Sequence, residues 1–326
     1  MIFLHLWNDA FDWVQAHLFE AVVQPFVNWA GMSDLVEISY DATGSFLVGV
    51  MQIFVLLLII GPLQRWKPVE RVTDKQAIRI DVLYTLLHRL GLFRLIMFFT
   101  VQNWVEMGVA WARGRGMPTL HVDQIWPGVT DQPGVSFVTY LILFDFIGYW
   151  YHRAQHQFNW WWALHSVHHS QRQMSMWSDN RNHLLDDVLF SALLVVLAIT
   201  IGVGPAQFVA LIALTDLSQS LQHANLKLSF GSIGERLWVS PRFHRVHHSV
   251  GIGHESEDKG TLGGHNFGIL LPWWDMLFGT ADFKRGFEAT GIRDQVEPDS
   301  TGHVRDYGRG FWAQQWLGLR RLAGQA

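Results

Sequence analysis

Histidines recur at short, regular spacings in the middle of the chain. The stretch HRAQHQFNWWWALHSVHH at 152–169 contains five of the 17 histidines and neither a carboxylate nor a cysteine. If this stretch is helical, His152 and His156 lie one turn apart on one face. The spacing i, i+3, i+4 occurs in HSVHH at 165–169 and again in HRVHH at 244–248. Neutral imidazole is a good ligand for iron, zinc or copper, and an i, i+4 pair can share one ion, so the pattern predicts a metal site.

The number of candidate ligands indicates two ions rather than one. Eight clustered histidines are joined by two isolated ones that lie next to apolar segments. The ten candidates are His152, His156, His165, His168, His169, His183, His223, His244, His247 and His248. One ion takes about four to six ligands, so this set fits two ions with positions left open. Because it contains only imidazole, iron, copper or zinc fits better than magnesium or calcium.

Two acidic residues lie within apolar segments, each seven residues before a candidate ligand. Asp145 precedes His152, and Asp216 precedes His223. Seven residues are two helical turns, so each acid is expected on the same face as its histidine, where it could orient the ring through a hydrogen bond. An acid within a membrane segment is a functional candidate by default, and the alternative is a polar contact between helices.

The composition predicts a membrane protein. Hydrophobic residues make up 49% of the chain and charged residues 16%, and the 17 tryptophans are more than a soluble core needs. Tryptophan is enriched where helices meet the boundary between lipid and water. A net charge of −4 gives no reason to expect nucleic acid as a partner, and the absence of cysteine excludes a thiolate site. The first residues lack the basic start of a cleaved signal peptide.

Apolar runs predict an all-α, multi-pass transmembrane helical bundle with a cytoplasmic, histidine-rich helical cap. The predicted spans are 46–63, 92–111, 135–151, 188–201 and 206–221, with a hinge at 202–205 between the last two. Arg65, Lys67, Arg71 and Lys75 follow the first span, so this loop is expected in the cytoplasm. With that orientation, both histidine-bearing loops emerge on the cytoplasmic side and can meet.

Four parts of the chain follow from this interpretation. Residues 1–45 are an amphipathic, interfacial N-terminal segment, and residues 46–134 hold transmembrane helices without an assignable motif. Residues 135–283 form the metal-binding domain, and residues 284–326 are a tail in which 309–322 is expected to be an amphipathic helix.

The histidine motifs resemble those of the fatty acid hydroxylase/sterol desaturase superfamily. HRAQH, HSVHH and HRVHH occur in the family's order, and HNFGILLPWWDMLFGT at 265–280 is similar to its closing NYG…WD…GT pattern. The resemblance covers about residues 135–283 and matches the ten candidate ligands by position, although Leu184 follows His183 where the family usually has proline. His265 and Asn266 are possible pocket residues, whereas His254 is interpreted as a loop residue.

The resemblance implies a membrane-bound di-iron oxidase that uses O2 and two electrons to hydroxylate or desaturate a C–H bond of a lipid such as a sterol or a fatty acyl chain. Zinc could replace the two iron ions on purification. Electrons would come from a separate donor, a ferredoxin or a small haem protein with its reductase. No catalytic residue separate from the metal ligands is expected.

Three other classes remain open from the residues alone. A membrane zinc-dependent hydrolase would need a general base near the metal, but neither histidine cluster contains an acid and the HExxH motif is absent. A bis-histidine haem protein needs only two histidines per haem. A metal-binding or metal-transport protein that catalyses no reaction would also account for the histidine ligands.

Overall fold

The computed structural model describes residues 2–118, 120–251, 263–284, 286–298 and 300–325, and within them the chain forms helices without β-strands. His254 lies outside the described residues. The helices are α1 (Ile2–Leu18), α2 (Gln24–Trp29), α3 (Val36–Val55), α4 (Gly61–Trp66), α5 (Lys75–Arg89), α6 (Leu92–Met97), α7 (Asn103–Gly114), α8 (Val122–Ile125), α9 (Pro133–Gln157), α10 (Asn159–His169), α11 (Leu184–Ile201), α12 (Pro205–His223), α13 (Gly231–Gly234), α14 (Pro241–His247), α15 (Trp273–Leu277), α16 (Arg293–Val296) and α17 (Phe311–Leu322).

Short π-helical or 3-10 segments join several of these helices. They are η1 (Phe19–Val23), η2 (Ser33–Leu35), η3 (Leu56–Ile60), η4 (Phe98–Gln102) and η5 (Ser178–Asn180). The all-helical prediction is confirmed for the described residues.

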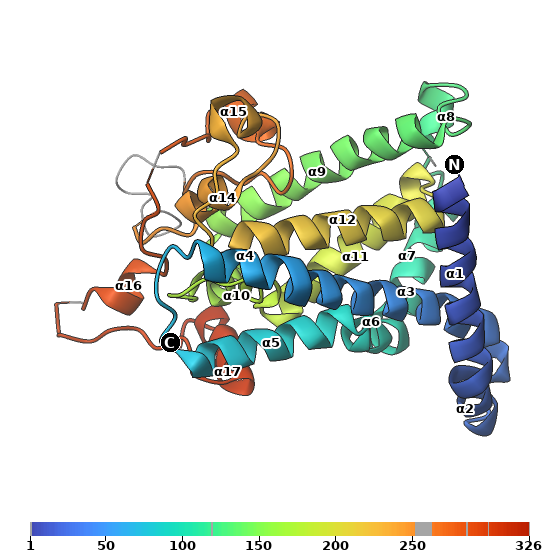
Figure 1. Ribbon diagram of the computed structural model, residues 1–326, viewed down its shortest axis with the longest axis horizontal. Helices are drawn as coiled ribbons and strands as arrows, with labels where there is room; N and C mark the ends of the chain where they lie inside the picture. The colour runs from blue at the N-terminus through green and yellow to red at the C-terminus, as the bar shows by residue number, and fades with distance from the viewer. Residues whose placement is uncertain (1, 119, 252–262, 285, 299, 326) are drawn as a thin grey trace.

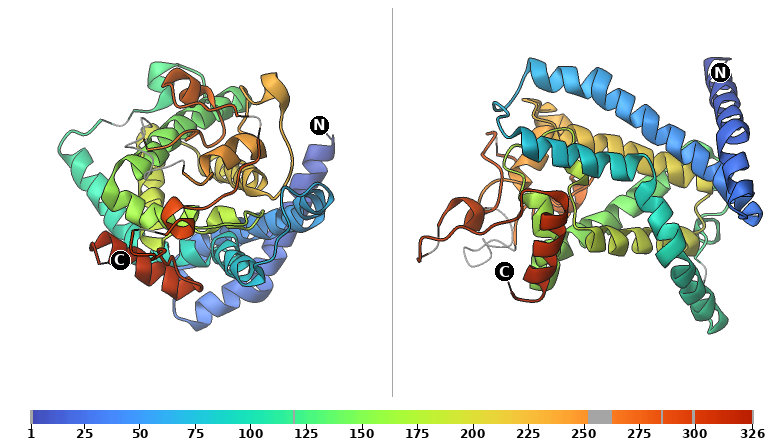
Figure 2. Two further views of the ribbon diagram at one scale, coloured as in Figure 1. Left: turned by 90° about the vertical axis from the view of Figure 1, so that its left-hand side faces the viewer. Right: turned by 90° about the horizontal axis from the view of Figure 1, so that it is seen from below.

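The long helices α3, α5, α9, α11 and α12 run roughly along one direction, and the cap lies at one end of them (Figure 1). The cap contains α10, α14, α15 and α17, whereas α1 and α2 cross the bundle at the opposite end. Seen from below, α17 lies beside α10 (Figure 2), and the two helices pack against each other. The elements that carry the histidines are therefore gathered at one end of the bundle.

Three helices of the described chain are long and apolar enough to cross a membrane, namely Ser33–Trp66, Pro133–Gln157 and Leu184–Ile201. A fourth candidate is the pair Lys75–Arg89 and Leu92–Gly114, which is bent by 56°. The predicted boundary at residue 45 falls inside α3.

The last predicted span, 206–221, forms α12 but does not meet the same criterion of length and apolarity. The physical reason is its polar second half, where Ser218, Ser220 and Gln222 are buried within the protein. The predicted hinge before it is present: Gly202 ends α11 with a φ of 73°, and Pro205 is at the start of α12. A positive φ favours glycine, and the fixed φ of proline suits the first helical turn.

The terminal helix α17 buries polar side chains and exposes its tryptophans. Gln315 donates to the Tyr84 hydroxyl at 2.8 Å and accepts from the backbone N–H of Leu184 at 2.8 Å. Trp312 and Trp316 are 77% and 62% exposed. The predicted helix is therefore present, but its polar side faces the protein because buried backbone and hydroxyl groups there require hydrogen-bond partners.

A buried arginine connects the bundle to the segment beside the histidines. Arg89 pairs with Asp179 at 2.8 Å and with Asp216 at 2.5 Å, and it donates to Gln52 and Ser220 at 3.2 and 3.1 Å. These contacts join α3, α5, η5 and α12. A buried charge is tolerated only when it is paired and hydrogen-bonded, and Arg89 meets this condition.

Candidate metal centre

Five histidines from three helices form the first cluster. They are His152, His156, His165, His169 and His247, which lie on α9, α10 and α14. One ring nitrogen from each lies within 4.8 Å of those of the others, and all five side chains are buried. The spacing i, i+4 on α9 and on α10 turns two histidines of each helix toward the same point.

Four histidines form the second cluster. They are His168 on α10, His223 at the end of α12, His244 on α14 and His248 just after α14. The Nε2 atom of His223 lies 3.1 Å from those of His168 and His244, and the Nε2 atoms of His244 and His248 are also 3.1 Å apart. Nitrogens around one ion with bonds of about 2.0–2.1 Å lie roughly 3–3.5 Å from one another, so this spacing fits a shared ion.

Neighbouring histidines in the sequence belong to different clusters. His168 joins the second cluster and His169 the first, and the same division separates His248 from His247. Consecutive helical residues point about 100° apart, so each HxxHH motif bridges the two clusters.

Buried ring nitrogens without a partner support metal binding. In the first cluster, Nε2 of His152, His165, His169 and His247 has no hydrogen-bond partner among the described residues. A buried polar atom without a partner is costly, and a bound ion would satisfy these nitrogens. The opposite nitrogens of two of these rings contact backbone carbonyls, with Nδ1 of His152 2.9 Å from Phe267 and that of His247 2.7 Å from His265. A proton on Nδ1 leaves Nε2 free to bind metal, which is the usual arrangement in metal sites.

Burial keeps the cap histidines neutral. It lowers the pKa of His168, His169, His244 and His248 well below the ordinary value of 6.5, and neighbouring histidines lower it further. For His247 burial is again the main cause, and the pKa falls to about 3. The clusters therefore present neutral imidazoles, the form that binds metal ions.

The metal-free protein is expected to lose stability as the pH falls below 6.5. The pKa of these histidines is lower in the folded state, so the unfolded chain binds more protons than the folded protein below about pH 6.5. The free energy of unfolding therefore has its full value above the unfolded pKa. On acidification below that pKa it falls by about 1 kcal/mol per histidine per pH unit. Thermal unfolding of chelator-treated protein at about pH 7.5 and about pH 5.5 measures it. An unchanged Tm between the two values would contradict this expectation.

His183 lies outside both clusters, which corrects its predicted role as a ligand. Its Nε2 is 2.9 Å from the carbonyl oxygen of Gln315, and its Nδ1 accepts from the backbone N–H of Leu185 at 3.1 Å. Both nitrogens are thus engaged with the backbone. Gly318 of α17 packs against this ring so closely that a Cβ would lie 2.4 Å from its Cδ2 atom. The side chain caps α11 and supports α17.

Neither predicted orienting acid contacts a ligand. Asp145 accepts from the backbone N–H groups of Leu270 and Leu271 at 2.7 and 3.1 Å and from Trp274 Nε1 at 2.9 Å. It thereby fixes the loop after Phe267, whose carbonyl contacts His152. Asp216 pairs with Arg89 instead of reaching His223. The expectation of a direct hydrogen bond to the ligands is therefore wrong for both.

His265 and Asn266 form hydrogen bonds that involve backbone groups and do not line the predicted pocket. The His265 carbonyl, not its ring, contacts Nδ1 of His247. Asn266 has a φ of 60°, donates to the carbonyls of Phe243 and Asp282 at 2.9 Å, and accepts from Asp282 N–H. Asparagine tolerates this left-handed conformation better than most residues. Neither residue lines the cavity beside the clusters.

Asp186 is the acid that reaches a ligand, and it is not among the site residues predicted from the sequence. Its Oδ2 lies 3.4 Å from Nδ1 of His165 and accepts from Gln155 at 2.6 Å. Its Oδ1 accepts from Tyr151 at 2.9 Å and from Trp161 at 2.8 Å. Acids in the first turn of a helix are common, so no local signal distinguishes Asp186 from Asp187.

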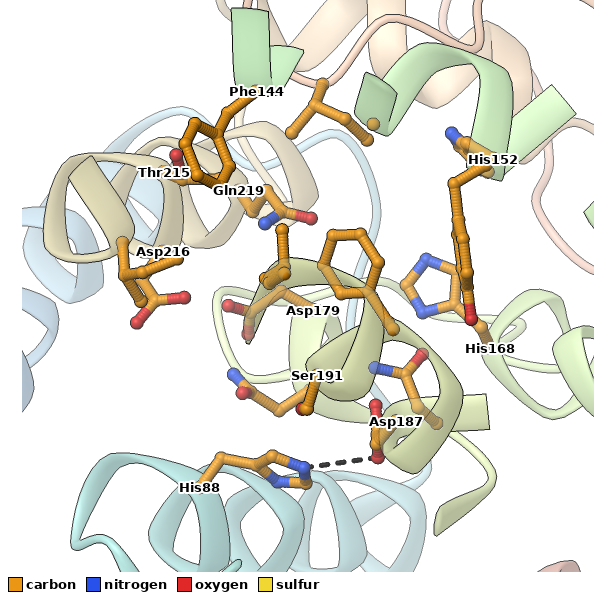
Figure 3. Close-up of a pocket in the computed structure, with 18 of the residues that line it drawn as sticks. His88, Phe144, His152, His168, Asp179, Asp187, Ser191, Thr215, Asp216 and Gln219 are labelled. Atoms are coloured by element: carbon orange, nitrogen blue, oxygen red, sulfur yellow. Dashed lines mark hydrogen bonds and ion pairs between the residues drawn. The ribbon is translucent and has the colours of Figure 1, made fainter. Parts of the chain in front are cut away.

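A cavity of about 270 Å³ adjoins the clusters. Four ligands line it, namely His152, His165, His168 and His244. Apolar side chains form much of the remaining wall: Leu141, Phe144, Phe190, Leu194, Leu211 and Ile212. In Figure 3, His152 and His168 lie on one side, Asp216 lies on the opposite side, and His88 pairs with Asp187 along a third. A ligand in this cavity would lie directly beside the histidines.

The fold and the two clusters define a helical protein with a histidine-lined metal centre at the end of an apolar bundle. Residues 137–280 match the model of the fatty acid hydroxylase family. This part of the chain is similar to the fatty acid hydroxylase/sterol desaturase superfamily. The resemblance found in the sequence is therefore confirmed.

Curated relatives carry several lipid-related names. The ornithine lipid hydroxylase OlsE of Rhizobium tropici is 28% identical over 193 residues, which are 58% of this chain and 51% of the relative. The alkylglycerol monooxygenase of Homo sapiens is 27% identical over 188 residues, 56% of this chain and 40% of the relative. A very-long-chain aldehyde decarbonylase of Oryza sativa subsp. indica is 25% identical over 185 residues, which are 53% of this chain and 28% of the relative. The matched part thus spans about half or less of each relative. No solved structure matches the chain.

Proposed function

We propose that the protein is a membrane-bound, O2-dependent di-iron oxidase that hydroxylates a C–H bond of a lipid. The observation that carries this proposal is the pair of all-histidine clusters opening on a largely apolar cavity. The relatives with hydroxylase and monooxygenase names support hydroxylation over desaturation. One atom of O2 would enter the lipid as a hydroxyl group, and the other would leave as water with two electrons and two protons from a separate donor such as a ferredoxin or a small haem protein.

The chain's own residues would hold and shield the reacting centre. Bound iron would supply the activation of O2 that removal of hydrogen from an unactivated carbon requires. The first cluster offers five nitrogens and the second four, so each ion would keep positions open. Apolar side chains such as Phe144, Phe190 and Leu211 would hold the lipid chain and exclude water.

A zinc-dependent hydrolase lacks the base that it would need. Neither cluster includes a carboxylate among the described residues. Asp186, the acid beside His165, already accepts from Tyr151, Gln155 and Trp161. A general base must have a free lone pair within reach of the metal-bound water, and this carboxylate is committed to other donors.

We expect freshly purified protein to contain about two iron ions per chain and to need O2 for turnover. Metal analysis without chelators, combined with mass spectrometry of lipids incubated with O2 and a reductant, checks both points. Zinc binds imidazole well and can occupy the sites after purification, so reconstitution with iron under anaerobic conditions is the matched control. A product formed equally well without O2, or a haem absorption band, would refute the proposal.

We further propose that the metal centre faces the cytoplasm. The end of the span Ser33–Trp66 and the segment after it, up to the start of α5, carry four exposed positive residues: Arg65, Lys67, Arg71 and Lys75. Positive residues favour the cytoplasmic side. Labels placed after Lys67 and at the C-terminal end should both be shielded from a membrane-impermeant reagent in intact cells. Labelling of the 65–75 loop from outside would reverse the orientation of the centre.

A further inference from the structure

The cavity beside the metal clusters contains polar atoms that a hydrocarbon chain alone leaves without partners. Gln222 is 2% exposed and lines the cavity, and its Oε1 has no hydrogen-bond partner among the described residues. Its Nε2 donates to the carbonyl of Ile269 at 2.8 Å, so the amide is held in one orientation. Asn180 also lines the cavity, and its buried Nδ2 has no partner either. Two residues of the cavity lining thus carry a buried acceptor and a buried donor without hydrogen-bond partners.

Both amides lie next to the second cluster. Gln222 directly precedes the ligand His223 in α12. Asn180 directly precedes Arg181, whose carbonyl oxygen lies 3.3 Å from Nδ1 of the ligand His168. Surrounding bonds fix the position of Asn180, because Asp179 before it accepts from Arg89 and Ser220. A group bound by these amides would lie close to the carbon that the metal centre oxidises.

Charged pairs make the opposite part of the cavity polar as well. His88 and Asp187 lie 3.1 Å apart, with side chains 17% and 14% exposed, and Asp216 is 27% exposed beside Arg89 (Figure 3). A lipid without polar groups would place hydrocarbon against these ion pairs and would leave the unpartnered atoms of Gln222 and Asn180 without a hydrogen bond. Leaving a buried donor or acceptor unsatisfied is a strong ground for rejecting a ligand.

We infer that the substrate is an amphiphilic lipid whose hydrogen-bonding group, a hydroxyl or an amide that both donates and accepts, enters this cavity between Gln222 and Asn180. Oxidation then occurs within a few bonds of that group rather than far along the chain. Only the position of oxidation depends on the proposed hydroxylation. Binding of the polar group is independent of the chemistry.

The test compares three probes with equal chains: hexadecylglycerol, hexadecanoylglycine and hexadecane. For the iron-loaded protein, kcat/KM for at least one polar probe should exceed that for hexadecane by at least about 100-fold. The hydroxyl group, located by mass spectrometry, should lie near the polar end. Gln222→Met and Asn180→Leu should each lower kcat/KM for the polar probe by about tenfold with unchanged iron content. Gln207→Met, on the same helix α12 but bonded to Ser136 outside the cavity, should change nothing.

The outcomes separate this inference from the proposed function. If no probe is oxidised, a binding measurement still tests the inference. A polar probe should raise the Tm of the wild-type protein and not that of Gln222→Met. Equal turnover of all three probes, a hydroxyl at the far end of the chain, or identical behaviour of wild type and both variants would overturn the inference. The last result would mean that water alone satisfies the two amides.

Discussion

Replacing His169 with alanine is expected to remove the ion of the first cluster and leave most of the ion in the second. Replacing its neighbour His168 should have the opposite effect, because His168 belongs to the second cluster. Each variant should contain about one ion per chain instead of about two. Turnover should fall by more than about 100-fold in both, since loss even of residues that only support ligands costs 10–100-fold.

His183→Ala is the matched control for these two variants. It is another buried histidine, but both of its nitrogens contact backbone groups of α11 and α17. Its loss should lower stability by about 1–2 kcal/mol and leave the metal content unchanged. Metal analysis, with Tm as a check on folding, distinguishes the two effects. Full occupancy of both ions in His168→Ala and His169→Ala would show that the clusters do not hold the metal.

Helical periodicity explains why the ligands could be predicted from the sequence. His152 and His156, like His165 and His169, face the same side of a helix at i, i+4, so their convergence follows from local geometry. Periodicity also places the acid Asp145 on the face of His152. It does not predict which neighbouring segment that face meets, and the partner of Asp145 is the loop at 270–274.

Roles that depend on tertiary packing could not be read from spacing. His183 has the residue type of a ligand, but α17, more than a hundred residues later in the chain, supplies its partner Gln315. Asp186 is followed by a second acid, and only the packing of α11 against α9 and α10 shows which of the two meets Tyr151, Trp161 and His165. The polarity of α17 is a similar case, because its buried Gln315 forms hydrogen bonds with groups on α5 and α11.

Replacing Asp186 with asparagine is expected to impair the first cluster without touching a ligand directly. The buried carboxylate accepts hydrogen bonds from Tyr151, Gln155 and Trp161 and lies 3.4 Å from Nδ1 of His165. In the asparagine variant, an NH2 group replaces one carboxylate oxygen and faces neighbours that are themselves donors. At least one buried donor is then left without an acceptor, at a cost of about 1–3 kcal/mol. The substitution also weakens the restraint on the His165 ring. Metal affinity of the first cluster and kcat should each fall by about 10–100-fold.

Asp187→Asn is the matched control for Asp186→Asn, because this neighbouring acid pairs with His88 and contacts no ligand. Its metal content should equal that of the wild type. Metal titration of both variants after removal of the ions, together with Tm, separates a weakened cluster from a destabilised fold. If Asp186→Asn retains wild-type metal affinity and turnover, then the backbone carbonyls and helix packing orient the ligands alone, and Asp186 only fills hydrogen bonds between α9, α10 and α11.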